Sequence, residues 1–237
     1  MILLYYPFYY DATYLLVIVA FVITTIAQLK VSSNYNKYKQ IACAKGVTGR
    51  EVARDILDKN GLEGIQIREV NGNLSDHYDP TKKTVNLSPD IYNGNSIAAI
   101  AVAAHECGHA IQDKEGYLFL RIRHSIIPGV NLCSKLGYFV IILGFLFSYF
   151  ELAMIGFIML CGILVFQLVT LPVEFNASNR AMVQLKELNI ISDRDNDNVG
   201  VKAMLGAAAM TYVASLASTL LQLLRMLLII MSRRNDD

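Results

Sequence analysis

Two histidines and a glutamate in the segment AVAAHECGHAIQD have the side-chain types and the spacing of a catalytic metal site. Residues four positions apart lie on one face of an α-helix, so His105 and His109 can both direct an imidazole nitrogen at one ion. Zinc binds neutral imidazole, and a catalytic zinc site keeps a fourth position for water. Glu106, beside the first histidine, can take the proton from that water as it attacks a carbonyl group.

A chance spacing of two core histidines is the competing interpretation. The surrounding segment is apolar, and two imidazoles buried on such a face would lack polar partners unless they bind a metal. Cys107 lies two positions from His105 and therefore points away from the shared face, where it packs as a small side chain. The pattern favours a metal site over a pair of structural histidines.

A third ligand must come from elsewhere in the chain. Metzincins extend the motif with a glycine and a third histidine, but Gln112 and Glu115 occupy those positions here. Gluzincins take a glutamate from a second helix. The segment LPVEFNASNRAMVQL supplies Glu174, and Pro172 just before it is typical of the first turn of a helix. Glu187 is a weaker alternative, and a glutamate early in a helix can also serve only the helix dipole.

Four long apolar stretches indicate an integral membrane protein. Hydrophobic residues make up 54% of the chain, and they cluster in stretches able to cross about 30 Å of hydrocarbon. The stretches cover residues 14–31, 129–150, 152–171 and 205–231. We expect the first to be a retained span rather than a cleaved signal peptide, because no basic residue precedes it. Its expected interfacial anchors are Tyr5, Tyr6, Tyr9 and Tyr10.

These stretches predict a mostly α-helical fold in five parts. We expect a membrane-embedded helical bundle with a zincin-like α+β catalytic domain, in which a small sheet or hairpin lies beside the HExxH helix. The predicted parts are an N-terminal transmembrane helix (1–31), a zincin-like catalytic region (32–128), a transmembrane hairpin (129–171), a helix with the third zinc ligand (172–204) and a C-terminal membrane helix (205–237).

Within the catalytic region the pattern predicts short helices and strands. Thr48 and Glu51 form the capping box of an amphipathic helix. Alternating apolar residues in GIQIREV predict a strand, and DHYDPTKKTVNLSP predicts a hairpin with its turn at Asp79 and Pro80. Asn95 or Ser96 can cap the helix that carries the two histidines.

The short connection SYFEL between the second and third apolar stretches predicts a tight membrane hairpin. The hairpin returns the chain to the side it left, so Glu174 is expected on the same side as His105. Basic residues favour the cytoplasm as that side. They are Lys30, Lys37, Lys39, Lys45, Arg121 and Arg123. Arg233 and Arg234 oppose this orientation if the last stretch crosses completely.

Other polar residues near the motif could assist the chemistry. The segment NLSDHYD is expected to form an edge strand of the cleft, where an extended peptide can pair through main-chain hydrogen bonds. His77 or Tyr78 could donate a hydrogen bond to the oxyanion, and Arg180 could orient a carboxylate or the oxyanion. The competing interpretations are an ordinary hairpin histidine and a surface ion pair.

The segments HECGHA, VEFNASNRA and DHYDPTKKTVNLSP resemble the YugP-like family of membrane neutral zinc metallopeptidases, and together they spread over most of the chain. The architecture is also similar to the HtpX and CAAX-protease group. The resemblance implies one catalytic Zn²⁺ held by His105, His109 and Glu174, with Glu106 as the catalytic base. The wider group has an aspartate where this chain has Ser178, so the partner expected to orient a histidine brings no charge here.

We therefore expect a zinc metalloendopeptidase of the gluzincin type, HExxH…E, in the plasma membrane of a bacterium. It would hydrolyse peptide bonds of proteins or peptides at the cytoplasmic face. The alternative is a zinc-containing membrane adaptor without proteolytic activity. An intramembrane protease of the site-2 type is disfavoured, because that type needs an aspartate in a later span and the four apolar stretches contain none.

The expected partners are peptide or protein substrates and the lipid bilayer. The net charge is close to zero and no basic cluster is long enough to indicate nucleic-acid binding. The small residues of AAAMTYVASLAS could pack against another helix, either within the chain or in an oligomer or a membrane protein partner.

Overall fold

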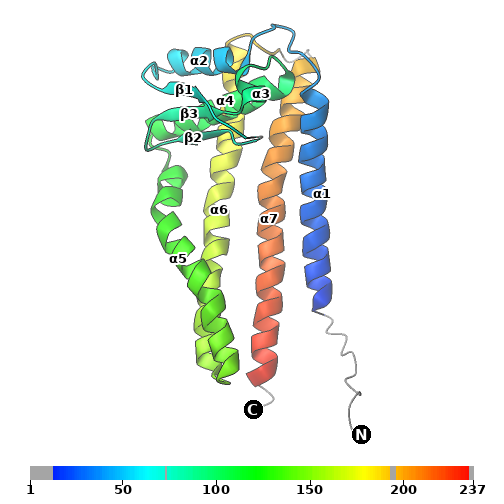
Figure 1. The fold of residues 1–237 in the computed structure, drawn as a ribbon, viewed down its shortest axis with the longest axis vertical. Coiled ribbons are helices and arrows are strands. Elements are labelled where there is room, and N and C mark those ends of the chain that lie inside the picture. Colours follow the sequence, from blue (N-terminus) through cyan, green and yellow to red (C-terminus); the bar gives the residue numbers. More distant parts are fainter. Residues whose placement is uncertain (1–12, 73, 193–195, 235–237) are drawn as a thin grey trace.

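Four long helices form a bundle, and one end of the bundle carries a small sheet with short helices (Figure 1). The structure is a computed structural model that describes residues 13–72, 74–192 and 196–234. The long helices are α1 (Tyr14–Tyr38), α5 (Leu118–Leu146), α6 (Phe150–Glu187) and α7 (Asn196–Arg234). The predicted fold class, a mostly helical membrane bundle with a small sheet, is confirmed.

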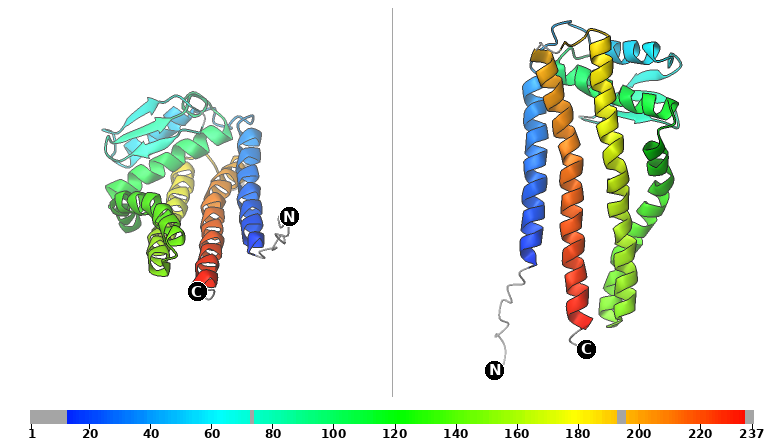
Figure 2. Two further views of the ribbon diagram at one scale, coloured as in Figure 1. Left: turned by 60° about the horizontal axis from the view of Figure 1, so that its bottom comes forward. Right: turned by 180° about the vertical axis from the view of Figure 1, so that it is seen from behind.

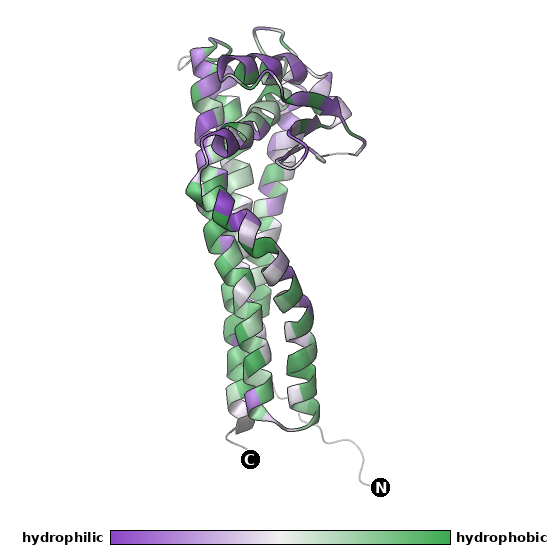
Figure 3. Cartoon of the chain, turned by 90° about the vertical axis from the view of Figure 1, so that its left-hand side faces the viewer, coloured by the Kyte–Doolittle hydropathy of each residue, from purple (hydrophilic) through white to green (hydrophobic). Residues whose placement is uncertain are grey.

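Each of the four long helices contains a stretch long and apolar enough to cross a membrane. Large apolar side chains on them are open to the surroundings, among them Phe21, Ile142 and Ile158, each more than half exposed. Apolar surface on this scale belongs in lipid rather than in water. Figure 3 shows the hydrophobic residues along the bundle and the hydrophilic ones at the end with the sheet. The tyrosines expected as anchors, within residues 5–10, lie outside the described residues.

The long helices continue beyond the predicted membrane stretches. Pro172 lies inside α6, so the prediction that a helix begins there is wrong. Similarly, α5 contains Pro128 and begins ahead of the second apolar stretch, and α7 begins ahead of the fourth. Proline removes one helical hydrogen bond, a loss that neighbouring helices make tolerable in membrane bundles. Hydropathy marks the end of the apolar residues, whereas the helices run on to pack against the polar part.

The polar part consists of three strands and three short or medium helices. They are α2 (Gly49–Lys59), β1 (Gln66–Glu69), β2 (His77–Asp79), β3 (Thr84–Leu87), α3 (Pro89–Tyr92) and α4 (Ile97–Lys114). The strand order is β1-β3-β2; β1 pairs with β3 in parallel, and β2 pairs with β3 antiparallel. The predicted hairpin is confirmed, and β2 lies at an edge of the sheet, as expected.

The two predicted helix starts have the expected caps. The Thr48 side chain accepts a hydrogen bond from the backbone N–H of Glu51, and the Glu51 carboxylate accepts one from the Thr48 backbone N–H, which completes the capping box. At α4 the capping residue is Ser96, whose hydroxyl accepts from the Ala99 N–H at 3.2 Å. Helix α4 is buried along most of its length and forms the centre of the polar part.

A short turn joins α5 and α6, and the two helices run back along each other (Figure 2). Helix α5 ends at Leu146 and α6 begins at Phe150, as the SYFEL connection predicted. The close approach of the pair depends on small residues, because a Cβ at Gly144 would lie 2.5 Å from the backbone nitrogen of Ala153. The hairpin brings the upper half of α6 against α4, on the side of the sheet.

Candidate metal centre

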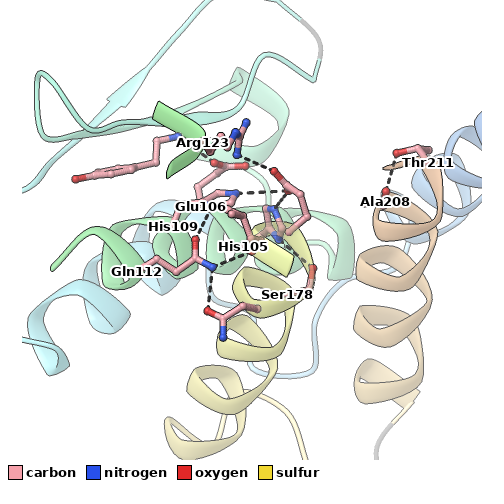
Figure 4. Close-up of polar contacts among 12 residues, drawn as sticks. His105, Glu106, His109, Gln112, Arg123, Ser178, Ala208 and Thr211 are labelled. Atoms are coloured by element: carbon pink, nitrogen blue, oxygen red, sulfur yellow. Dashed lines mark hydrogen bonds and ion pairs between the residues drawn. The ribbon is translucent and has the colours of Figure 1, made fainter. Parts of the chain in front are cut away.

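His105, His109 and Glu174 lie together where α4 crosses α6. Their ligand atoms are all within 4.8 Å of one another. Nε2 of His105 is 3.3 Å and Nε2 of His109 is 3.6 Å from Oε2 of Glu174. Figure 4 shows both histidines directed at the same point. Among the residues that the structure describes, no other group of three or more His, Cys, Asp and Glu side chains comes together in this way.

The three donors fit a zinc ion. Zinc binds imidazole nitrogen and carboxylate oxygen at about 2.0–2.2 Å in a tetrahedron, which places neighbouring ligand atoms about 3.4 Å apart. The two nitrogen–oxygen separations lie on either side of that value. Burial alone lowers the pKa of His109, but hydrogen bonding to Glu174 and the charge of Glu106 raise it on balance. The surroundings of this ring therefore favour a positive charge.

The crossing of α4 over α6 depends on a glycine. A Cβ at Gly108 would lie 2.5 Å from the carbonyl oxygen of Ala177, so no larger residue fits without displacing a backbone. Gly108 directly precedes His109, and Ala177 follows Glu174 by about one helical turn. Backbone contact at this point thus brings the carboxylate beside the two imidazoles.

Gln112 determines which nitrogen of His109 is available to a metal. Its side-chain amide is fully buried and donates to the Val173 carbonyl oxygen at 2.8 Å and to Oδ1 of Asn176 at 2.9 Å. Both donors are thereby used, and Oε1 is left 3.0 Å from Nδ1 of His109. Nδ1 therefore carries a proton, and in the neutral ring the lone pair of Nε2, on the side of Glu174, is available to a metal.

Ser178 and Arg123 contact the other two members of the cluster. The hydroxyl of Ser178 is 3.2 Å from Nδ1 of His105, on the side of the ring away from Glu174. Nη1 of Arg123 donates to Oε1 of Glu174 at 3.0 Å, while Oε2 faces the histidines. Each of the three clustered side chains thus has a polar partner on its outer side (Figure 4).

Glu106 lies beside the cluster and contacts the edge strand β2. Its side chain is nearly buried, and Oε2 accepts a hydrogen bond from the backbone N–H of Tyr78 at 2.9 Å. The Tyr78 phenol turns away and donates to Asp113 at 2.7 Å. Burial and the Asp113 carboxylate raise the pKa of this phenol. The structure thus brings the Tyr78 main chain to the site and directs its hydroxyl elsewhere.

The other two residues expected to assist have different surroundings. Nδ1 of His77 donates to the Ser75 carbonyl oxygen at 2.8 Å, and Nε2 lies 3.2 Å from the Asn86 amide. His77 nevertheless lines a cavity beside the cluster. Arg180 pairs with Glu115 at 2.6 Å, which matches the surface ion pair considered as the alternative. The structure does not bring Arg180 to the cluster.

Two cavities meet at the cluster, and His105, Glu106 and Glu174 line both. A polar cavity of about 190 Å³ lies toward β2 and α5, where His124 and Arg123 contribute to its wall. An apolar cavity of about 200 Å³ lies toward α1 and α7. The candidate metal centre is therefore accessible from two sides with different chemistry.

Comparison with known proteins identifies the family. Residues 13–231 match the family described as "Putative neutral zinc metallopeptidase". The chain belongs to this family. It is also similar to the "Putative membrane protease YugP" of Bacillus subtilis (strain 168), with 44% identity over 211 residues, which cover 89% of this chain and 93% of the relative. No solved structure matches the chain. The resemblance inferred from the sequence is confirmed.

Several residues around the cluster were not foreseen from the sequence. Gln112 had served only to exclude a metzincin, although its position one turn after His109 could have indicated a contact. Arg123 had been counted only among the basic residues that favour the cytoplasmic side, but it and His124 line the polar cavity. Tyr212 lines both cavities, and it lies in an apolar stretch where no local pattern distinguishes it.

Proposed function

We propose that the protein is a membrane-bound zinc metalloendopeptidase of the gluzincin type, which hydrolyses peptide bonds of proteins or peptides at the cytoplasmic face of the plasma membrane. One observation carries this proposal. His105, His109 and Glu174 come together where two cavities meet; His105, Glu174 and the Glu106 carboxylate line both cavities, and His109 lines the polar one. An ion held there is open to a substrate and has a base beside it.

In this proposal one catalytic Zn²⁺ is held by His105, His109 and Glu174. When bound, zinc lowers the pKa of a water molecule and polarises a carbonyl group. Gln112 keeps the proton of His109 on Nδ1, and the Ser178 hydroxyl can accept a hydrogen bond from Nδ1–H of His105. Such outer partners orient the ligands and raise their affinity for the metal.

Glu106 acts first as a general base and then as a general acid. Its carboxylate takes a proton from the water whose oxygen forms the new bond to the scissile carbonyl carbon. The same proton then goes to the amine nitrogen as the carbon–nitrogen bond breaks. The Tyr78 N–H, 2.9 Å from Oε2, orients the carboxylate for this transfer. His77, in the wall of the polar cavity, remains the candidate for contact with the oxyanion.

The length of α6 supports a site at the membrane surface. Glu174 lies about 36 Å along the helix from Phe150 at the hairpin turn, at 1.5 Å per residue. The hydrocarbon core of a bilayer is about 30 Å thick. A hairpin turn at one surface therefore puts the cluster at the other. The basic residues near the polar part favour the cytoplasm for that surface.

The catalytic role of Glu106 can be tested in the full-length protein purified in detergent. We expect Glu106→Gln to retain zinc, measured by elemental analysis, and to lose about 10²-fold to 10⁴-fold of its activity on an unfolded protein such as casein. Glu63→Gln makes the same change at an exposed position and should retain both properties. Hydrolysis that survives in Glu106→Gln would exclude the mechanism.

The orientation has a separate test. Helix α7 ends at the end of the bundle opposite the sheet (Figure 1). A cytoplasmic site therefore requires the C-terminus on the outer side. A reporter enzyme that is active only outside the cytoplasm should be active when fused to the C-terminus. An inactive, intact fusion would reverse the proposed orientation.

The adaptor alternative has less support. A structural zinc site is usually closed by four protein ligands, and within the described part of the chain the cluster has three. A base beside an open site also has no purpose in a purely structural role. If the wild-type protein contains zinc but does not hydrolyse casein in the same assay, the adaptor would be favoured.

A further inference from the structure

The apolar cavity beside the metal centre is built by helices from opposite ends of the chain. Val31 of α1 and Met204, Leu205 and Ala208 of α7 line it, and Ala101 of α4 closes it near the histidines. In Figure 4, α7 is seen beside the cluster, marked by Ala208 and Thr211. The walls from α1 and α7 therefore consist of aliphatic side chains, small alanines and two tyrosines, Tyr35 and Tyr212.

Charged groups occupy only one end of this cavity. The three carboxylates in its lining are those of Asp76, Glu106 and Glu174, and all three also line the polar cavity. The walls from α1 and α7 bring no charge. A ligand that extends from the metal centre toward α7 thus leaves a polar environment and enters an apolar one.

The cavity also lies at the level of the bilayer surface. Val31 is the last residue of the first apolar stretch, and Leu205 is the first residue of the fourth. Both residues contribute to its wall. A peptide segment that leaves the bilayer, or lies along its surface, can therefore present an apolar side chain to the cavity without crossing the polar part.

We propose that the apolar cavity is a substrate subsite for one large aliphatic or aromatic side chain next to the scissile bond, presented by a segment at the membrane surface. This inference rests on the proposed peptidase function and adds the substrate class to it. A cavity of about 150 Å³ lined by aliphatic residues takes up benzene. The volume of about 200 Å³ is accordingly sufficient for one leucine, phenylalanine or tryptophan side chain.

Ala208 is the residue that leaves room for such a side chain on the α7 side. A phenylalanine there would project its ring into the space that the substrate side chain is to occupy. Met210 is two positions further along the same helix and is 47% exposed, so Met210→Phe adds a ring to α7 outside the cavity. These two substitutions form a matched pair.

A binding measurement can use the composition of the chain, which contains no tryptophan. Short peptides that differ only at one central position, with Trp, Leu, Ala, Gly or Asp there, are titrated into full-length protein carrying Glu106→Gln, so that bound peptide is not cleaved. Fluorescence excited selectively in tryptophan then comes from the Trp peptide alone, and the other peptides are measured by competition.

We expect the Trp and Leu peptides to bind at least about tenfold more tightly than the Gly and Asp peptides, since burial of a large apolar side chain accounts for more than one factor of ten. The emission of the bound Trp should shift to shorter wavelength. Addition of Ala208→Phe should remove most of this preference, whereas addition of Met210→Phe should retain it.

Equal binding of all five peptides would overturn the subsite. An unchanged preference in a folded Ala208→Phe protein would also overturn it. If that variant fails to fold, the order of the five peptide affinities for the Glu106→Gln protein still decides whether the subsite exists. Failure of the proposed function is a different result: the wild type would bind the Trp peptide with the expected preference and cleave none of the five.

Discussion

Arg123 and Glu174 form an ion pair in which only one carboxylate oxygen takes part. Nη1 of Arg123 is 3.0 Å from Oε1, and Oε2 faces the two histidines. The Glu174 side chain is 4% exposed, whereas that of Arg123 is 25% exposed. The arginine therefore neutralises a buried carboxylate from the side of the polar cavity and leaves the other oxygen directed at the metal centre.

Removal of Arg123 should make the protein more dependent on zinc. Without the guanidinium, the metal-free state contains a buried carboxylate that has lost its permanently charged partner, which costs about 3 kcal/mol. Zinc neutralises the same carboxylate when it binds. We expect Arg123→Gln to lower the midpoint of thermal unfolding measured in the presence of a chelator. We also expect the increase in this midpoint on addition of zinc to be larger than in the wild type. Arg121→Gln, at an exposed position, is the control; an equal or smaller rise in Arg123→Gln would contradict this role.

Replacement of Gln112 should weaken zinc binding through His109. Gln112→Leu removes the acceptor that keeps the proton on Nδ1, and it leaves the Val173 carbonyl oxygen without its donor. Loss of an outer partner of this kind lowers metal affinity about 10-fold to 100-fold. Competition with a chromogenic zinc chelator measures the change. Gln184→Leu, which breaks a bond to Asn60 ten residues along α6 from Glu174, should leave the affinity unaltered.

A methyl group at Gly108 should separate α4 from α6. The Cβ of Gly108→Ala would be 2.5 Å from the Ala177 carbonyl oxygen, and overpacking of this kind costs about 1–3 kcal/mol. Gly206→Ala meets nothing within 4 Å and should stabilise its helix by up to about 1 kcal/mol. Thermal unfolding in detergent compares the two variants. A Gly108→Ala protein as stable as Gly206→Ala would mean that the crossing is looser than the structure indicates.

The contribution of Asp113 to stability should depend on pH. Burial alone raises the pKa of this carboxyl, but hydrogen bonds from Lys83 and from the Tyr78 hydroxyl lower it below its ordinary value. A carboxyl with a lowered pKa in the folded state stabilises the fold above its ordinary pKa of about 4 and loses this effect as the pH falls. Asp113→Asn should therefore unfold at a lower temperature than wild type at neutral pH.

The difference in unfolding temperature between the wild type and Asp113→Asn should shrink as the solution is made more acidic. Asp55→Asn is the control, because burial and the neighbouring carboxylates Asp58 and Glu51 raise the pKa of Asp55. Loss of that charge should not destabilise the protein at neutral pH. A wild-type advantage over Asp113→Asn that persists unchanged into acid would show that the hydrogen bonds of Asp113 act without its charge.

The sequence by itself determined the features that depend on near neighbours in the chain. The spacing of His105 and His109 follows from one helical turn, and the capping box of Thr48 and Glu51 follows from local hydrogen bonding. The apolar stretches and the short SYFEL connection determined the membrane hairpin, and with it the side on which Glu174 lies. Each of these inferences rests on contacts within a few residues, or on lengths compared with a bilayer.

The tertiary structure decided what depends on how distant helices cross. The continuous course of α6 through Pro172 is set by packing with its neighbours, which outweighs the lost hydrogen bond. The contacts of Gln112 with Val173 and of Arg123 with Glu174 join residues more than fifty positions apart. No periodicity can predict them, because they arise only where the backbones of α4 and α6 touch at Gly108 and α5 packs beside them.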